Sequence, residues 1–309
     1  MRRTGPRTPG YARFVLETPD LTAAGIARMA ERWLEEDRAR ADLTGLWSLP
    51  PGLRARGSVE AQASGVLSGM SAAVAIARAM GVRARPRKRD GQRVRRGDVV
   101  LELEGQARSL LACERTLLNA LMHLSGVATA TARVVQAAAR AGTGTVVAAT
   151  RKTLPGLRDL EKSAVVHGGG DPHRRDLSSS VLLKSNHLAL VDLPTLLARV
   201  RSHRKGAHPV IVEVRTAREA AEAVHGGADR LLIDNLTPRQ VRTLLRGLER
   251  SGLRRKVVVE VSGGITERNV AAYSRAGADV ASLGGITHSA PALSFHMVVR
   301  PAGPSGRGR

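Results

Sequence analysis

The stretch that decides the fold is residues 257–285, VVVEVSGGITERNVAAYSRAGADVASLGG. It opens on the apolar run VVVEV and passes through a glycine turn into an alanine-rich helical segment that closes on Gly277. A second apolar run, DVASL at 279–283, and a second glycine pair follow. A buried strand, a helix and another buried strand in this order indicate a parallel βαβ unit with a right-handed crossover.

The same alternation of apolar runs and helical stretches extends towards the N-terminus. Helical stretches separate most of the earlier apolar runs, and Thr237 with Pro238 supplies an N-cap and a first helical residue to one of these helices. Strands that are apolar almost throughout are buried on both faces. We therefore predict an α/β barrel, although periodicity alone leaves its closure open. The earlier runs are VVAA (146–149), VLL (181–183), PVIVEV (209–214) and LLI (231–233).

The first part of the chain is organised differently. Residues 21–41 have a helical pattern, and VRRGDVVLELEG at 94–105 alternates and ends on glycine as a strand does. The alanine- and leucine-rich stretch 107–141 predicts a helix that is interrupted near Ser125 and Gly126. The chain is therefore expected to divide near residue 120.

Four parts follow from this division. We predict a disordered basic arm, a first domain that mixes a helix with strands, a catalytic barrel domain, and a C-terminal segment. The last of these is expected to return towards the first domain and to end in a disordered tail. The predicted bounds are 1–16, 17–118, 119–285 and 286–309.

The composition narrows the class of protein. The 309 residues suffice for one large domain or two, and no apolar run approaches the ~20 residues of a membrane span. No apolar stretch follows the basic N-terminus as a signal peptide would require. The single cysteine, Cys113, excludes an intramolecular disulfide and a cysteine-rich metal site. A cytoplasmic protein is the expectation.

The formal charge of +22 raises the possibility of nucleic-acid binding. The chain has only two Trp, two Tyr and two Phe, however, which argues against a stacking platform for single strands. The basic residues recur from end to end, and nearly all are arginine, which is typical of a solvated basic surface. Of the few lysines, Lys152, Lys162 and Lys184 lie close together in the sequence. A nucleic-acid partner is therefore unlikely on these grounds, whereas an anionic substrate is expected.

Polar residues follow the predicted strands, where the chemistry of α/β barrels collects. Glycine turns between a strand and a helix let backbone N–H groups approach a phosphate, and the last two loops of a barrel are its usual phosphate site. Carboxylates at strand ends serve an ion pair with Lys or Arg, a Mg²⁺ carried by a pyrophosphate, or positive charge on a sugar carbon. The residues are Thr150, Arg151, Lys152, Thr153, Lys184, Asn186, His187, Glu213, Asp234, Asn235, Ser262, Gly263, Gly264, Gly284 and Gly285.

The most specific part of the chain is 150–187, TRKTLPGLRDLEKSAVVHGGGDPHRRDLSSSVLLKSNH. It places many cations beside a GGG turn and between two buried strands, which indicates a pocket for a multiply charged anion. The cations are Arg151, Lys152, Arg158, Lys162, His173, Arg174, Arg175 and Lys184.

The motifs TRKTLPGLRDLEK, GGGDPHR and KSNH, in this order, resemble the central signature of the quinolinate phosphoribosyltransferases. The resemblance extends to GVLSG, ERTLLNALMHLSGVAT, VEV, IDN, EVSGGI and THSAPAL, and covers about 65–301. A fainter likeness lies at 35–37 (EED) and 42–44 (DLT). A relative found in molybdenum operons shares some of these motifs.

The resemblance implies an N-terminal α/β sandwich domain followed by an open, TIM-like α/β barrel. The implied reaction joins quinolinate to phosphoribosyl pyrophosphate with Mg²⁺ as cofactor, and gives nicotinate mononucleotide, pyrophosphate and CO₂ in NAD biosynthesis. The implied assembly is a homodimer, with further association possible, in which the first domain of one subunit covers the barrel of the other.

The resemblance also implies a role for each matching residue. Lys152, Lys184, Glu213 and Asp234 are the expected catalytic residues, and Glu213 and Asp234 also serve the metal through the substrate. The pyridine dicarboxylate is held by Arg151, His173 and Arg174, with Arg115 from the partner subunit, and Asn186 and His187 complete the substrate-binding set. The phosphate-binding set is Ser262, Gly263, Gly264, Gly284 and Gly285.

Four positions depart from the family pattern: Ala149, Ser185, Arg215 and Ser294. Ser185 adjoins Lys184 and removes a negative charge that the family usually has there. Two alternatives to the implied reaction therefore stay open. One is a paralogue that acts on another pyridine or aromatic carboxylate, and the other is a nucleic-acid-binding protein on the same fold.

Overall fold

The computed structural model describes residues 21–204 and 208–302, so the predicted arm at 1–16 and the end of the predicted tail lie outside the described residues. The chain forms two compact units. The sheet unit comprises the described residues of Pro19–Ala130, Asp159–Gly169 and Ala290–Arg309. The barrel unit comprises Thr131–Arg158 and those of Gly170–Ser289. No helix among the described residues is long and apolar enough to cross a membrane.

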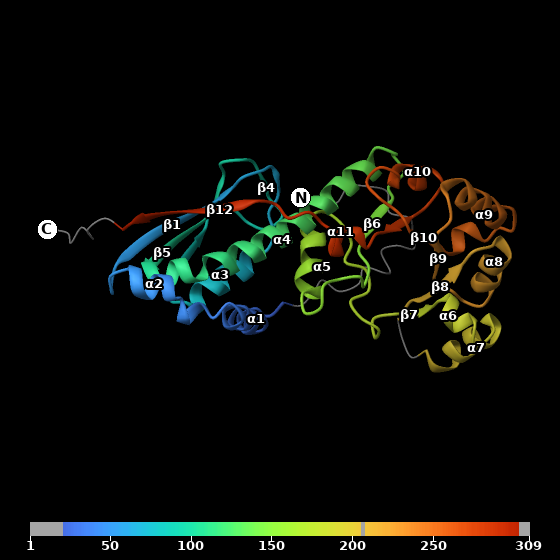
Figure 1. Ribbon diagram of the computed structural model, residues 1–309. Helices are drawn as coiled ribbons and strands as arrows, with labels where there is room; N and C mark the ends of the chain where they lie inside the picture. The colour runs from blue at the N-terminus through green and yellow to red at the C-terminus, as the bar shows by residue number, and fades with distance from the viewer. Residues whose placement is uncertain (1–20, 205–207, 303–309) are drawn as a thin grey trace. The chain divides into compact units, whose positions relative to one another are not determined.

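The sheet unit is built on a four-stranded antiparallel sheet in the order β12-β1-β5-β3. The C-terminal strand β12 (Phe295–Pro301) pairs along the whole of β1 (Arg54–Ala61), and Figure 1 shows the red strand lying beside the blue one. Alternate residues of β1 are buried, because one face of the sheet packs on apolar side chains. The other elements are β3 (Arg83–Pro86), β5 (Val99–Gln106), α1 (Ala23–Glu36), α2 (Leu43–Ser48), α3 (Met70–Ala79), η2 (Ala39–Ala41) and the small ladder of β2 (Gly65–Val66) with β4 (Arg93–Val94).

The strand expected over 94–105 is divided in the structure. β4 ends at Val94 and β5 begins at Val99, and a turn separates them. Gly97 adopts a φ of 88°, and the backbone N–H of Arg95 donates to the carboxylate of Asp98 at 2.8 Å. The prediction of one strand was wrong because Gly97 and Asp98 form a tight turn inside an otherwise alternating pattern.

The barrel unit contains six parallel strands in the order β6-β11-β10-β9-β8-β7. Each strand from β7 to β10 lies beside the next one in the chain, and β6 pairs with β11, so that β6 and β7 form the two ends of the sheet. This is the open α/β barrel that the sequence predicted, confirmed with all six of its strands. The strands are β6 (Val146–Ala148), β7 (Val181–Leu183), β8 (Val210–Val214), β9 (Arg230–Asp234), β10 (Val258–Ser262) and β11 (Val280–Ser282).

Helices follow the strands of this sheet as the βαβ pattern requires (Figure 1). In α9 the Thr237 side chain accepts a hydrogen bond from the backbone N–H of Gln240, and Pro238 occupies the first turn, as predicted. Its buried residues recur three or four positions apart, which gives the helix one apolar face. The helices are α6 (Ser185–Leu188), α7 (Leu193–His203), α8 (Ala217–His225), α9 (Pro238–Arg250), η3 (Arg254–Lys256), α10 (Val270–Arg275) and α11 (Gly285–His288). The helix that follows β6 is α5 (Arg158–His167), and all of it but Arg158 belongs to the sheet unit.

The long helix α4 (Ala107–Ala139) continues through the positions where an interruption was expected. Ser125 is buried, and its hydroxyl donates to the carbonyl of Ser68 while accepting from the Ser68 N–H, each at 3.0 Å. At Gly126 a Cβ atom would lie 2.3 Å from the carbonyl oxygen of Pro291. The prediction was wrong because these two residues let other backbone segments approach the helix closely, and they do not break it.

Gly126→Ala should therefore destabilise the protein, although alanine favours helices by about 1 kcal/mol over glycine elsewhere. The new methyl group would meet backbone atoms of Pro291 and Ala292, which cannot move aside as a side chain can. We expect a net loss of roughly 1–3 kcal/mol in the free energy of unfolding, measured by urea denaturation. Gly25→Ala is the control, because its Cβ would meet only the Thr22 hydroxyl at 3.1 Å. Equal stability of the two variants would contradict the close approach at Gly126.

Candidate active site

A cavity of about 1240 Å³ lies in the barrel unit. Most of its polar lining comes from residues at or just beyond the carboxyl ends of the strands, where barrel chemistry is expected. The volume exceeds the range of about 300–1,000 Å³ that is usual for one small ligand. Ten of the predicted site residues line it, namely Arg151, Lys152, His173, Arg174, Lys184, His187, Asp234, Ser262, Gly263 and Gly264.

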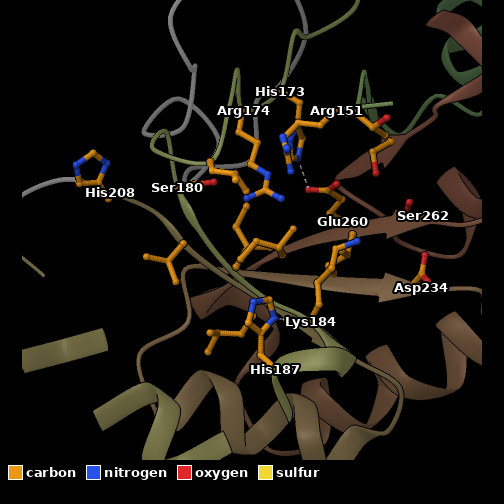
Figure 2. A pocket seen from close by; sticks show the side chains of 18 of the residues that line it. Arg151, His173, Arg174, Ser180, Lys184, His187, His208, Asp234, Glu260 and Ser262 are labelled. Carbon is orange, nitrogen blue, oxygen red and sulfur yellow. Dashed lines mark hydrogen bonds and ion pairs between the residues drawn. The ribbon is translucent and has the colours of Figure 1, made fainter. Parts of the chain in front are cut away.

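The centre of the cavity wall is a buried ion cluster around Glu260. Its carboxylate lies 3.0 Å from Nε2 of His173 and 2.8 Å from the guanidinium of Arg230. Burial alone would raise the pKa of Glu260, but the charge and hydrogen bond of His173 and the charge of Arg230 lower it overall. Glu260 is therefore ionised, and Nε2 of His173 carries the proton that it donates (Figure 2).

Sequence reasoning missed Glu260 and Arg230 as parts of the site. The signal was present, because Glu260 is the one charged residue in VVVEV and Arg230 opens a buried strand. A charge in the middle of a buried strand needs a partner. What the sequence did not reveal is that His173, 87 positions away, is one of them.

The segment that carries His173 and Arg174 has a strained and well-anchored backbone. His173 adopts a φ of 56°, a region that non-glycine residues rarely occupy. Its N–H donates to the carboxylate of Asp171 at 2.7 Å, and Asp171 itself forms a parallel bridge with Ala148 of β6. These contacts hold His173 and Arg174 at the cavity despite the strained backbone. Backbone strain of this kind is common at functional sites.

Several donors in this region are set towards a ligand. Nδ1 of His173 and Nε of Arg151 are buried and have no hydrogen-bond partner among the described residues. Burial, followed by the charge of Arg151, lowers the pKa of Arg174, and a bound anion would offset the repulsion between the two guanidinium groups. Figure 2 shows Lys184 extending towards the His173–Glu260 pair from the other side of the cavity. The arrangement favours a ligand with more than one carboxylate.

The loop after β10 has the geometry of a phosphate-binding turn. Gly263 and Gly264 adopt φ values of 86° and 59°, and a Cβ atom on Gly263 would lie 2.2 Å from the side-chain oxygen of Asn235. Ser262 is in register with Asp234 on the neighbouring strand, so the loop and this carboxylate share one edge of the cavity. Only glycine allows the backbone this close approach.

Gly284 lies beside Lys152, although it does not line the cavity itself. A Cβ atom there would lie 2.7 Å from Cδ of Lys152, and the Thr287 hydroxyl donates to the carbonyl of Lys152 at 2.7 Å. The segment after β11 therefore fixes the position of this lysine. Gly285 is exposed at the start of α11 and has open space where a Cβ would be.

Besides Gly284 and Gly285, three further predicted residues do not line the cavity. Asn186 is exposed in α6, and Arg115 is exposed on the part of α4 that belongs to the sheet unit. Glu213 is buried in β8, with its carboxylate 3.8 Å from the guanidinium of Arg215. This contact matches the ion pair that was considered as one role for the carboxylate.

The described residues contain no group of three or more His, Cys, Asp or Glu side chains that could hold a metal ion. Among the residues that line the cavity, the carboxylates are Asp234 and Glu260, and Glu260 is engaged with His173 and Arg230. Asp234 accepts a hydrogen bond from the side-chain amide of its neighbour Asn235 and is only partly buried. A Mg²⁺ ion at this cavity fits only if a substrate supplies most of its oxygen ligands.

Comparison with known proteins agrees with this geometry. The models of the quinolinate phosphoribosyl transferase N-terminal and C-terminal domains match residues 42–125 and 127–298. A probable nicotinate-nucleotide pyrophosphorylase (carboxylating) of Archaeoglobus fulgidus is 47% identical over 212 residues, 69% of this chain and 81% of that protein. One of Methanothermobacter thermautotrophicus is 40% identical over 260 residues, 84% of this chain and 93% of that protein. The solved nicotinate-nucleotide pyrophosphorylase of Francisella tularensis has a TM-score of 0.84 at 28% identity, and the match covers 92% of this chain and 99% of that one.

Glu260→Gln should lower the free energy of unfolding at pH 7 by roughly 3–5 kcal/mol, because it removes the charge that compensates the buried guanidinium of Arg230 and that accepts a hydrogen bond from His173. Since the folded-state pKa of Glu260 is depressed, its stabilisation is complete above the ordinary value of 4.5 and declines as the pH falls below it. Urea denaturation at pH 7 and pH 3.5 should therefore show a smaller difference between wild type and variant in acid. Exposed Glu267→Gln is the control, and a difference that does not shrink in acid would contradict the ionised cluster.

Proposed function

Because the chain belongs to the quinolinate phosphoribosyl transferase family, we propose that it transfers the phosphoribosyl group of phosphoribosyl pyrophosphate to quinolinate. The products are nicotinate mononucleotide, pyrophosphate and CO₂, in NAD biosynthesis. The observation that carries the proposal is the cavity itself, which combines buried cations with a glycine turn and has room for two ligands. A cytoplasmic location is part of the proposal, since Cys113, the one cysteine of the sequence, is a free thiol.

The pyridine dicarboxylate would bind at His173, Arg174 and Arg151. The Nε of Arg151 would then acquire a carboxylate acceptor, and Nδ1 of His173 would acquire a hydrogen-bond partner on the ligand. Glu260 balances part of the cationic charge and fixes the ring orientation of His173, so the pocket is set before the ligand arrives. Lys184 would approach the same ligand from β7.

The phosphorylated sugar would lie along the other edge, with its 5′-phosphate at Ser262, Gly263 and Gly264. Backbone N–H groups of such a turn can surround a phosphate without a side chain in the way. Asp234, on the neighbouring strand, would then face the ribose, where positive charge develops as pyrophosphate leaves C1. Lys152 would neutralise the departing pyrophosphate.

The bond changes are balanced by the two substrates. The pyridine nitrogen attacks C1 of the ribose as the bond to pyrophosphate breaks, and the ring becomes cationic. The C–C bond to the adjacent carboxylate then breaks, CO₂ leaves, and a proton replaces it on the ring carbon. The cationic ring holds the electron pair in between, so the side chains need only position two anions that would otherwise repel each other.

Mg²⁺ is the cofactor that we propose, carried in by the pyrophosphate. It would supply charge neutralisation on the leaving group. Asp234 is the cavity residue that could hold it, and Glu213 would take part only if its contact with Arg215 opened.

We also propose a homodimer in which Arg115 of one subunit reaches the other's substrate. Arg115 is exposed on α4, one turn after the exposed Leu111, so both lie on the same face of the helix. Trp47 is 81% exposed in α2. The carbonyl of Leu49, the residue that follows α2, accepts hydrogen bonds from Arg108 at the start of α4, so α2 lies close to this end of α4. An exposed apolar face with an arginine beside it is typical of an interface.

The first test is pyrophosphate release from phosphoribosyl pyrophosphate and Mg²⁺, with quinolinate or nicotinate as acceptor. We expect turnover and CO₂ release with quinolinate and none with nicotinate, because two carboxylates are needed to engage the cations. Lys184→Ala should lower kcat/KM by roughly 10²–10³-fold, as removal of a charge-stabilising donor does.

Arg242→Ala is the matched control, because this exposed arginine of α9 lies away from the cavity lining. No turnover of quinolinate by the folded protein would overturn the proposal. Turnover of a different aromatic carboxylate would then identify the paralogue that the departure at Ser185 leaves open.

Mixing two inactive variants tests the shared site. Arg115→Ala and Lys184→Ala should each be nearly inactive, but half of the dimers in an equal mixture combine both chains. In each hybrid one site is intact and the other carries both substitutions, so about a quarter of the wild-type activity should return if subunits exchange freely. Recovery is measured as pyrophosphate release after partial denaturation and refolding of the mixture. A mixture no more active than its components would rule out a contribution of Arg115 across the interface.

A further inference from the structure

The cavity has a second half that the proposed reaction does not use. Its residues come from the amino ends of β7 and β8 and from the last turns of α7, whereas Asp234 and Ser262 lie at the carboxyl ends. The N–H of Val181 donates to the carbonyl of Pro209 at 3.0 Å, which brings Ser180 and His208 to the same end of the sheet. Figure 2 shows these two residues on one side of Arg174 and Asp234 and Ser262 on the other. We call this the amino-end half of the cavity.

Ser180 is the clearest sign of a ligand there. The residue is 4% exposed, it lines the cavity, and its hydroxyl is buried without a hydrogen-bond partner among the described residues. Most buried hydroxyls in folded proteins have a partner, so such a group calls for an explanation. A ligand atom that accepts its proton provides one.

The charges around Ser180 favour an anion. Arg199, His203 and His208 line this half, and no carboxylate among the described lining residues lies here. Arg204 is already paired with Asp229 at 2.9 Å, but the guanidinium of Arg199 has no acidic partner among the described residues. The available positive charge therefore comes from Arg199, and the imidazoles of His203 and His208 add groups that can form hydrogen bonds.

The remaining lining of this half is apolar, from Val181, Leu182, Val200 and Ile211. A polar hydroxyl and cations above an apolar floor match a ligand with a carboxylate on a flat apolar body. We propose that the amino-end half binds a small aromatic carboxylate, with Ser180 and Arg199 on the carboxylate and the ring over Val181 and Val200. The inference does not depend on the reaction: it concerns a second site for this ligand class in the same cavity.

The test is titration with 4-fluorobenzoate, followed by ¹⁹F NMR of the full-length protein. We expect binding by wild type and equally by Lys184→Ala, since the latter alters only the other half. Arg199→Glu should weaken binding by at least tenfold and Ser180→Ala by about three- to tenfold, which is the range for one hydrogen bond. Arg242→Glu, an exposed change of equal charge on α9, should bind as wild type does.

Ser180→Ala provides a readout that a structural role could not give. Because its hydroxyl is unpaired in the described structure, the variant should keep or raise the melting temperature while it loses affinity. The proposal is overturned if wild type does not bind, if Arg199→Glu and Ser180→Ala bind normally, or if Lys184→Ala abolishes binding. Since the readout is binding, failure here leaves the pyrophosphate-release result untouched, and failure of that reaction leaves this site standing.

Discussion

The site depends on one buried carboxylate. Glu260 lies in the middle of β10 and joins His173, from the segment between β6 and β7, to Arg230 at the start of β9. Because the carboxylate is fully buried, losing Arg230 would leave its charge uncompensated and losing His173 would remove a hydrogen bond to it. The same contact that holds the sheet and the 171–174 segment together also orients the imidazole towards the cavity. The stability of the sheet and the geometry of the cavity are therefore coupled through a single residue.

This coupling explains why the strain at His173 is tolerated. A positive φ at a non-glycine residue costs of order 1–3 kcal/mol, and it persists only where surrounding contacts determine the conformation. The backbone bond to Asp171 and the side-chain bond to Glu260 supply these contacts. In return the turn directs two successive side chains, His173 and Arg174, into one cavity. A relaxed extended backbone would send them to opposite sides.

The sequence predicted the barrel well because its strands are short and rich in apolar, β-branched residues. A polar residue or a glycine follows each strand at its carboxyl end. Ten predicted site residues meet at one cavity for the same reason. Two of the failures have a common cause. The continuous helix at Gly126 and the buried partners of Glu260 depend on what lies opposite in space, and periodicity contains no such information. The turn at Gly97 is different, because it is a local Gly-Asp turn that an alternating pattern concealed.

The open seam between β6 and β7 has a further consequence for motion. A closed barrel restrains each strand from both sides, but these two strands have a ladder partner on one side only, apart from the single bridge between Ala148 and Asp171. Terminal strands of a sheet open at lower free energy than central ones. Lys152 and Lys184 lie just beyond these two strands, so the residues on opposite edges of the seam are attached to the strands with the least ladder support, whereas β8, β9 and β10 are each paired on both sides.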